Sequence, residues 1–278
     1  MSTRTGGRNT EGVGVGTSFR APHYLAHLHE QPYTARLAGA GSLRRELESL
    51  LEAALPEATP DMLRSLVLHS NVTGKASAAA RLWVWKRLKL RYVLDPGICE
   101  YRVFVKAMRE LSSPADRGLL CFLMFTRTDR LFREVTLQSV SPLLLQADTT
   151  IDPSTIEAAI NARAESEGLK WSTNTLNRAQ SHLLAALKDF GILRGSLTKR
   201  TVIPRPGHQV TVFASLLGRL QGLTDRQLLD SEWFSLLGLS RERTIELLYA
   251  AARAGALGFR MQADIVEVEL SSLNGGPE

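Results

Sequence analysis

Apolar side chains recur at helical spacing along nearly the whole chain from Pro32 onward. A leucine stripe predicts a helix that Ser42 opens and that runs to Leu55. Thr59-Pro60 and Ser113-Pro114 each place a capping hydroxyl before a proline, which is typical of a helix start. Further helices are predicted over 77–92, 100–111, 128–140, 152–167, 233–239 and 240–254, and another after Gly207.

The stretch from Trp171 to Arg205 predicts a helix that is followed at once by a short β-hairpin. Ser172 or Thr173 can cap the helix start, and Gly191 stands where a left-handed helix stop is expected. Strands are predicted over 192–194 and 201–203. A capped helix joined to a basic hairpin is typical of a winged-helix unit, which suits a DNA groove and its phosphates.

These elements predict a mainly α fold with an N-terminal helical bundle and C-terminal winged-helix-like units that carry short β-hairpins. Residues 141–153 contain the turn signals expected of a joint between domains. Residues 255–270 alternate in polarity around 262–264, which predicts a second hairpin. The predicted parts are a flexible tail over 1–20, a helical domain over 21–148, a winged-helix-like unit over 149–217, and a second helix-hairpin unit with its tail over 218–278.

The charge balance indicates that this helical protein has a polyanionic binding partner. The chain has 278 residues, a net charge of +6 and a pI of about 9.6. Its two cysteines, Cys99 and Cys121, lie among apolar neighbours, which indicates a reduced, cytoplasmic protein. No apolar run approaches the roughly 20 residues that span a bilayer, and no signal segment is found, so no membrane association is expected.

The first candidate for DNA contact is the helix and hairpin after Trp171. Asn174 and Asn177 can reach base edges, where asparagine pairs well with adenine. Lys199, Arg200 and Arg205 charge the hairpin with no acid between them. The basic side chains of the helix and hairpin would hold the phosphates. They are Arg178, Arg194, Lys199, Arg200 and Arg205. The alternatives are a plain helix and hairpin of an α-rich protein, or a unit that contacts another protein.

The second candidate is the basic helix over 81–92. Five cations occur in eleven residues without an acid, which is unusual for a solvated face. They are Arg81, Lys86, Arg87, Lys89 and Arg91. Leu82, Trp85, Leu88 and Tyr92 are expected on the buried side. The basic helix would follow a phosphate backbone, or its charges would pair with acids elsewhere, such as Glu46, Glu48 or Glu52.

Motifs of catalysis and metal binding are missing from the sequence. There is no nucleophile elbow, phosphate-binding lysine loop, HExxH pair or cysteine-based zinc pattern. His23, His27 and His29 lack a ligand at matching spacing, so no metal site is expected. The glycine run over 12–16 follows no strand and is expected to belong to the flexible tail. We therefore expect a binding protein without cofactors rather than an enzyme.

Several segments together resemble the BrxA family of BREX phage-exclusion systems. They are Tyr33-Thr34-Ala35-Arg36-Leu37 with the acidic helix around Glu46, Asn71 before Ser77 and its basic helix, and the block over 171–193. The resemblance covers about 32–217, and residues 218–270 depart from it as an added helix-hairpin module. It implies a non-enzymatic component that binds double-stranded DNA and works beside a methyltransferase, an ATPase and other BREX proteins.

The sequence thus predicts a double-stranded DNA-binding component of phage defence that contacts mainly phosphates and has limited sequence preference. One alternative is an adaptor that docks an acidic partner protein on the same basic faces. Another is a winged-helix transcription regulator, which predicts a dimer and a palindromic site. No long heptad repeat supports such a dimer.

Overall fold

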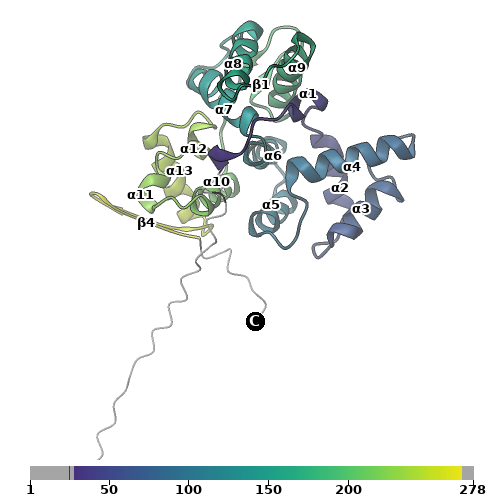
Figure 1. Ribbon diagram of the computed structural model, residues 1–278. Helices are drawn as coiled ribbons and strands as arrows, with labels where there is room; N and C mark the ends of the chain where they lie inside the picture. Colours follow the sequence, from purple (N-terminus) through teal and green to yellow (C-terminus); the bar gives the residue numbers. More distant parts are fainter. Residues whose placement is uncertain (1–24, 26–27, 271–278) are drawn as a thin grey trace, which may run out of the picture.

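The computed structural model describes residue 25 and residues 28–270 (Figure 1). This part of the chain is mainly helical and contains two two-stranded antiparallel sheets, so the predicted mainly α class is confirmed. No helix in it is both long enough and apolar enough to cross a membrane. The tail predicted over 1–20, its glycine run, His23 and His27 lie outside the described residues.

The N-terminal helices follow the predicted order and caps. The side chains of Thr59, Ser77 and Ser113 each accept a hydrogen bond from a backbone N–H of the first turn, as predicted. Ser42 does not open a regular helix, because Leu43 is left-handed (φ 54°) and the helix starts after it. The elements are η1 (Leu28–Glu30), α1 (Arg36–Gly39), α2 (Arg44–Ala53), α3 (Pro60–Leu68), α4 (Ala78–Tyr92), α5 (Cys99–Glu110) and α6 (Pro114–Thr128).

The middle of the chain contains the predicted helix and hairpin after Trp171. Asp129 caps the first helix of this part by accepting from Phe132 N at 3.0 Å, and Asp152 caps the next. The elements are α7 (Arg130–Ser139), η2 (Ser141–Leu145), α8 (Pro153–Ser166), α9 (Thr173–Asp189), β1 (Leu193–Arg194) and β2 (Arg200–Thr201).

The last part repeats the pattern of a helix followed at once by a hairpin. Ser240 caps its long helix, and Ala263 (φ 51°) makes the turn between two strands that pair from Gly258–Glu269 to Gln262–Ile265. The predicted second hairpin is therefore confirmed. The elements are α10 (His208–Leu220), α11 (Asp225–Leu228), α12 (Glu232–Ser235), α13 (Arg241–Arg253), β3 (Gly258–Gln262) and β4 (Ile265–Glu269).

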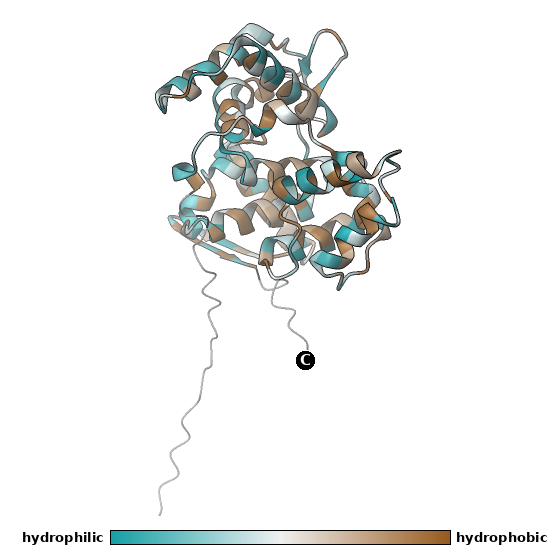
Figure 2. Cartoon of the chain, turned by 45° about the vertical axis from the view of Figure 1, so that its right-hand side comes forward, coloured by the Kyte–Doolittle hydropathy of each residue, from teal (hydrophilic) through white to brown (hydrophobic). Residues whose placement is uncertain are grey.

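The hydrophobic core is continuous across these parts, with α6 at its centre. Residues 118–126 of this helix are all buried. Phe125 on α6 contacts Phe132 on α7 and Phe190 at the end of α9, with ring centroids 4.7 and 5.5 Å apart. Figure 2 shows apolar residues concentrated on the helices in the middle of the molecule. The boundaries predicted at 148 and 217 remain predictions.

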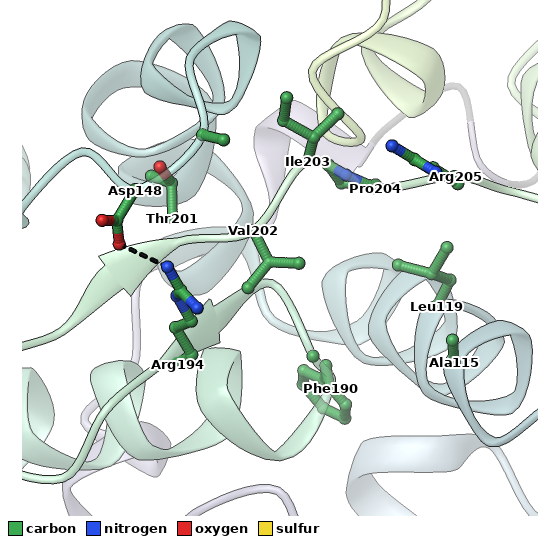
Figure 3. Close-up of a pocket in the computed structure, with 12 residues that line it drawn as sticks. Ala115, Leu119, Asp148, Phe190, Arg194, Thr201, Val202, Ile203, Pro204 and Arg205 are labelled. Carbon is green, nitrogen blue, oxygen red and sulfur yellow. Dashed lines mark hydrogen bonds and ion pairs between the residues drawn. The ribbon is translucent and has the colours of Figure 1, made fainter.

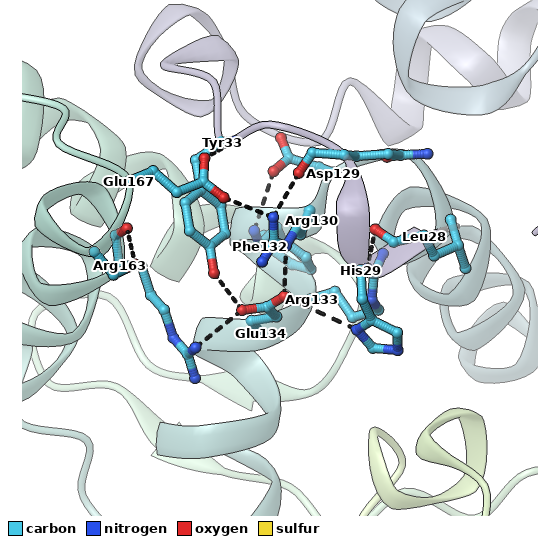
Figure 4. Close-up of polar contacts among 12 residues, drawn as sticks. Leu28, His29, Tyr33, Asp129, Arg130, Phe132, Arg133, Glu134, Arg163 and Glu167 are labelled. Atoms are coloured by element: carbon cyan, nitrogen blue, oxygen red, sulfur yellow. Dashed lines mark hydrogen bonds and ion pairs between the residues drawn. The ribbon is translucent and has the colours of Figure 1, made fainter. Parts of the chain in front are cut away.

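A cluster of ion pairs fixes the N-terminal segment to α7 and α8 (Figure 4). Glu134 on α7 accepts a hydrogen bond from the Tyr33 hydroxyl and pairs with Arg130 at 2.7 Å and Arg163 at 3.1 Å. Arg130 also pairs with Glu167, at 2.7 Å. Burial raises the pKa of Glu134, but the hydrogen bonds from Tyr33 and Arg130 outweigh it, so the pKa lies below its usual range. The cluster positions the chain just before α1.

Candidate nucleic-acid interface

Helix α9 presents a polar face to solvent that begins at its N-terminus. Ser172 caps the helix by accepting from Thr175 N at 3.2 Å. Asn174, Asn177 and Arg178 are exposed, and in the described part of the chain their side chains have no hydrogen-bond or ion-pair partner. The opposite side of the helix is buried through Ala179, Leu183 and other apolar residues. The three predicted contact residues of α9 therefore share one accessible face.

Neighbouring elements hold α9 rigidly in this orientation. From α8, Pro153 O accepts from Gln180 Nε2 at 2.7 Å. On the other flank lies α1, where Leu37 O is 2.9 Å from the ring Nδ1 of His182. The C-terminal end is tied to the start of α2, because Asp189 O accepts from Arg44 Nη1 at 2.7 Å. A helix held on both flanks offers a preorganised binding face.

The β1–β2 hairpin leaves α9 directly and is joined by a third extended segment. Leu193 pairs with Thr201 and Arg194 with Arg200. Residues 149–151 extend the sheet, since Thr201 N donates to Thr149 O and Ile151 N donates to Lys199 O, both at 2.9 Å. Gly195 (φ 94°) makes the turn, where a Cβ would clash with Thr198 O. The hairpin tip is thus a tight, exposed loop beside the end of α9.

The charge of the hairpin differs from the prediction that it carries cations alone. Asp148, which precedes the third extended segment, pairs with Arg194 at 2.7 Å and with Arg200 at 3.0 Å. The hydrogen bond from Arg194 holds the pKa of this carboxylate below its usual range. Lys199 donates to Ser196 O, whereas Arg205 is exposed and has no polar partner within 28–270. One acid therefore neutralises part of the basic surface that the sequence predicts.

A cavity of about 490 Å³ lies between this hairpin and α6. Figure 3 shows Leu119, Phe190 and Val202 around it, with the Asp148–Arg194 ion pair on one side. Its walls are mainly apolar. Among the residues that the structure describes, no group of three or more His, Cys, Asp or Glu side chains could hold a metal ion.

Helix α4 divides the five predicted contact residues between surface and interior. Lys86 and Lys89 are exposed and have no polar partner among residues 28–270, and Arg81 and Arg87 are half-buried. Arg91 is only 4% exposed, so it is not a surface contact and the prediction for it is wrong. Its Nη2 donates to Ala40 O at 2.6 Å and to Arg36 O at 3.2 Å.

Arg91 is buried because the buried face of α4 is rotated about the helix axis relative to the face predicted from the sequence. The buried stripe consists of Val84, Trp85, Leu88, Arg91 and Tyr92. Leu82, predicted to be buried, is 38% exposed, and Trp83 next to it is 43% exposed. Burial lowers the pKa of Arg91, whose guanidinium lies 4.6 Å above the Phe125 ring. Arg91 is therefore a structural residue that attaches α1 to α4.

The short helix α1 connects the two predicted contact elements (Figure 1). It packs against α9, and Arg91 donates to the carbonyl group of Arg36 in the helix and to that of Ala40 just after its end. The guanidinium of Arg87 lies against Gly39, where a Cβ would be 2.8 Å from Nη2. Arg36 is exposed between α9 and α4 and has no polar partner for its side chain in the described chain. Sequence reasoning missed Arg36, because four helical residues give no periodic signal.

Comparison with known proteins adds one finding. The family model for BrxA matches residues 31–214, which is more than half of the 278-residue chain. The matched range contains α1, α4, α9 and the β1–β2 hairpin, and it ends within α10. The match confirms the resemblance seen in the sequence. No curated protein matches the chain.

Proposed function

The chain belongs to the BrxA family, and on this premise we propose that it binds double-stranded DNA as a non-enzymatic component of a BREX phage-defence system. It acts together with other BREX proteins in the cytoplasm. Binding is mainly to phosphates, with limited sequence preference. The observation that carries the proposal is the exposed, unpartnered face of α9, with Asn174, Asn177 and Arg178, beside the basic hairpin.

The order of elements supports a winged-helix mode of binding. Helix α7, the extended segment 149–151, helices α8 and α9, and the hairpin follow one another, and the extended segment pairs with β2. In helix-turn-helix proteins the second helix of the pair enters the major groove with its N-terminal residues on base edges. Asn174 and Asn177 lie in the first two turns of α9, at that end.

The positively charged side chains contact the phosphates in two groups, one on α9 and the hairpin and one on α4. Arg178 on α9 and Lys199, Arg200 and Arg205 on and after the hairpin hold phosphates, together with Arg194. Arginine is suited to this task because its planar fork binds phosphate oxygens in pairs. On α4, Lys86 and Lys89 offer a second line of contact, and Arg36 lies between the two. Arg91 is buried and does not belong to this exposed line of contact.

The decisive experiment is a salt titration of binding to a random-sequence duplex of about 30 base pairs, starting near 50 mM salt. We expect the logarithm of the affinity to fall linearly with the logarithm of salt concentration. Arg178→Gln should weaken binding to all sequences and reduce the slope by about 1. The matched control is Arg64→Gln, since Arg64 on α3 is also exposed and without a partner in the described chain. Undetectable binding at the lowest salt contradicts the proposal.

A second candidate function, an adaptor for a protein partner, is favoured by one observation on α4. Its outer face combines Leu82 and Trp83, which are 38% and 43% exposed, with the exposed Lys86. Apolar side chains gain nothing from phosphates but much from a protein interface. Binding of purified BREX proteins that survives nuclease treatment and is lost in Trp83→Ala would support the adaptor.

A further inference from the structure

A polar groove of about 400 Å³ separates the N-terminal segment from the end of α4 and the junction of α6 with α7. Thr34 and Arg36 line one side, Lys89 another, and Thr128 and Asp129 a third. A recess of about 10 Å³ adjoins it, shares Arg36 and Asp129, and reaches Arg87 and Arg91. That volume is about one water-sized sphere, so the recess has room for a single oxygen atom.

The groove has an excess of positive charge without internal partners. The side chains of Arg36, Arg87 and Lys89 form no hydrogen bond or ion pair within residues 28–270. Two other arginines of the groove are already paired, Arg127 with Glu100, and Arg130 with Glu134 and Glu167. Asp129 is the carboxylate among the lining residues, and it is occupied as the cap of α7. The charge of Asp129 acts on Arg36 and Arg91, but the four cations Arg36, Arg87, Lys89 and Arg91 of the groove and its recess outnumber this one carboxylate.

Arg91 at the back of the recess supplies an independent observation. The residue is only 4% exposed. Nη2 has two carbonyl partners, whereas Nη1 and Nε are buried and have none. A buried donor of a charged group without an acceptor costs free energy. An oxygen atom of an anion in the recess would provide the missing acceptor.

We propose that this groove is a binding site for a phosphate group. Arg36 and Lys89 hold the outer oxygens at the rim, and one oxygen enters the recess toward Arg91. A guanidinium fork and an ammonium group together are the usual partners of phosphate. The phosphate belongs either to a DNA backbone or to a free phosphorylated molecule such as a nucleotide, since the chemistry of recognition is the same.

The site is tested by calorimetric titration of the full chain with inorganic phosphate in a chloride buffer of matched ionic strength. We expect saturable binding with one phosphate per chain, weakened at least tenfold in Arg36→Gln/Lys89→Gln. Both substitutions are at the surface, and a thermal unfolding curve verifies the fold. The control Arg64→Gln/Lys106→Gln removes two exposed cations elsewhere and should bind as the unaltered chain does. No saturable binding, or equal binding by all three proteins, overturns the site.

The same three proteins distinguish the two sources of phosphate. If the bound group is a DNA phosphate, Arg36→Gln/Lys89→Gln also loses duplex affinity, and inorganic phosphate competes with the duplex. If it belongs to a free molecule, neither inorganic phosphate nor a 5′-nucleotide competes with the duplex, and the nucleotide binds to the unaltered chain and not to the double variant. Failure of phosphate binding with intact duplex binding overturns this site and leaves the proposed DNA-binding function standing.

Discussion

At the scale of single residues, Asp148 limits the positive charge of the hairpin. Its carboxylate pairs with Arg194 and Arg200, and its positive φ of 64° is one that asparagine also adopts readily. Asp148→Asn should therefore preserve the turn and release two guanidinium groups. If the hairpin binds phosphates, the variant should bind duplex DNA more tightly, with a salt slope steeper by about 1 to 2. A salt titration measures both quantities.

Asp61→Asn is the matched control for this gain. Asp61 is exposed in the first turn of α3, so the substitution removes the same charge far from the hairpin. It should leave the slope unchanged, because charges beyond a Debye length of about 10 Å are largely screened. Equal gains in the two variants would mean that net charge alone, and not the hairpin, controls binding.

The ion pairs of Asp148 also show which contacts cannot be predicted from the sequence. The stretch over 192–205 contains four cations and no acid, and that much is evident from the chain. Asp148 lies 46 and 52 positions before its two partners, so only the pairing of segment 149–151 with β2 brings them together. Local spacing predicts which residues share a helix face, but it does not predict an ion pair made by tertiary contact.

At the scale of elements, local signals predicted the helices and missed their contacts. The caps at Thr59, Ser77, Ser113 and Ser172 depend on four consecutive residues, and the structure confirms each of them. The burial of Arg91 depends on where α1 lies, and α1 is too short to be visible as a periodic pattern. The candidate site was therefore predicted on α9 and only in part on α4.

Glu134 is the shared anion of the cluster that joins the N-terminal segment to α7 and α8, and its side chain is largely buried. Glu134→Gln should lower the free energy of unfolding by about 1 to 3 kcal/mol at pH 7, because charged hydrogen bonds to Tyr33 and Arg130 are lost. The pKa of Glu134 is lowered in the folded state. Its contribution is therefore present above the unfolded pKa of about 4.3 and disappears as the pH falls through the folded value.

Urea denaturation at several pH values tests this sign. The gap in stability between the unaltered chain and Glu134→Gln should be full at pH 7 and should narrow below about pH 4. Glu57→Gln serves as the control, since Glu57 is exposed and without a polar partner in the described chain. A gap that stays constant down to pH 3 would show that Glu134 stabilises the fold by packing alone.

At the scale of the whole molecule, the core extends beyond the range that the family model matches. The match ends at residue 214, inside α10, yet Trp233 and Phe234 further along are 0% and 1% exposed. Trp233 also donates from its indole to Gln221 at 3.0 Å. The last helix-hairpin part is thus packed against the rest of the protein through the same core and is expected to unfold with it.

The positions of the four tryptophans allow this expectation to be tested along the chain. Trp83 and Trp85 lie on α4, Trp171 precedes α9, and Trp233 lies on α12. Variants that keep only Trp85, only Trp171 or only Trp233 each report on a different part, with phenylalanine replacing the others.

Since these parts share one core, fluorescence from each variant should change at the same urea concentration as its own far-UV circular dichroism. A single transition in every probe is the mark of all-or-none unfolding. A separate, earlier transition seen only through Trp233 would mean that the last part is an independent domain, and DNA-binding experiments could then be made without it.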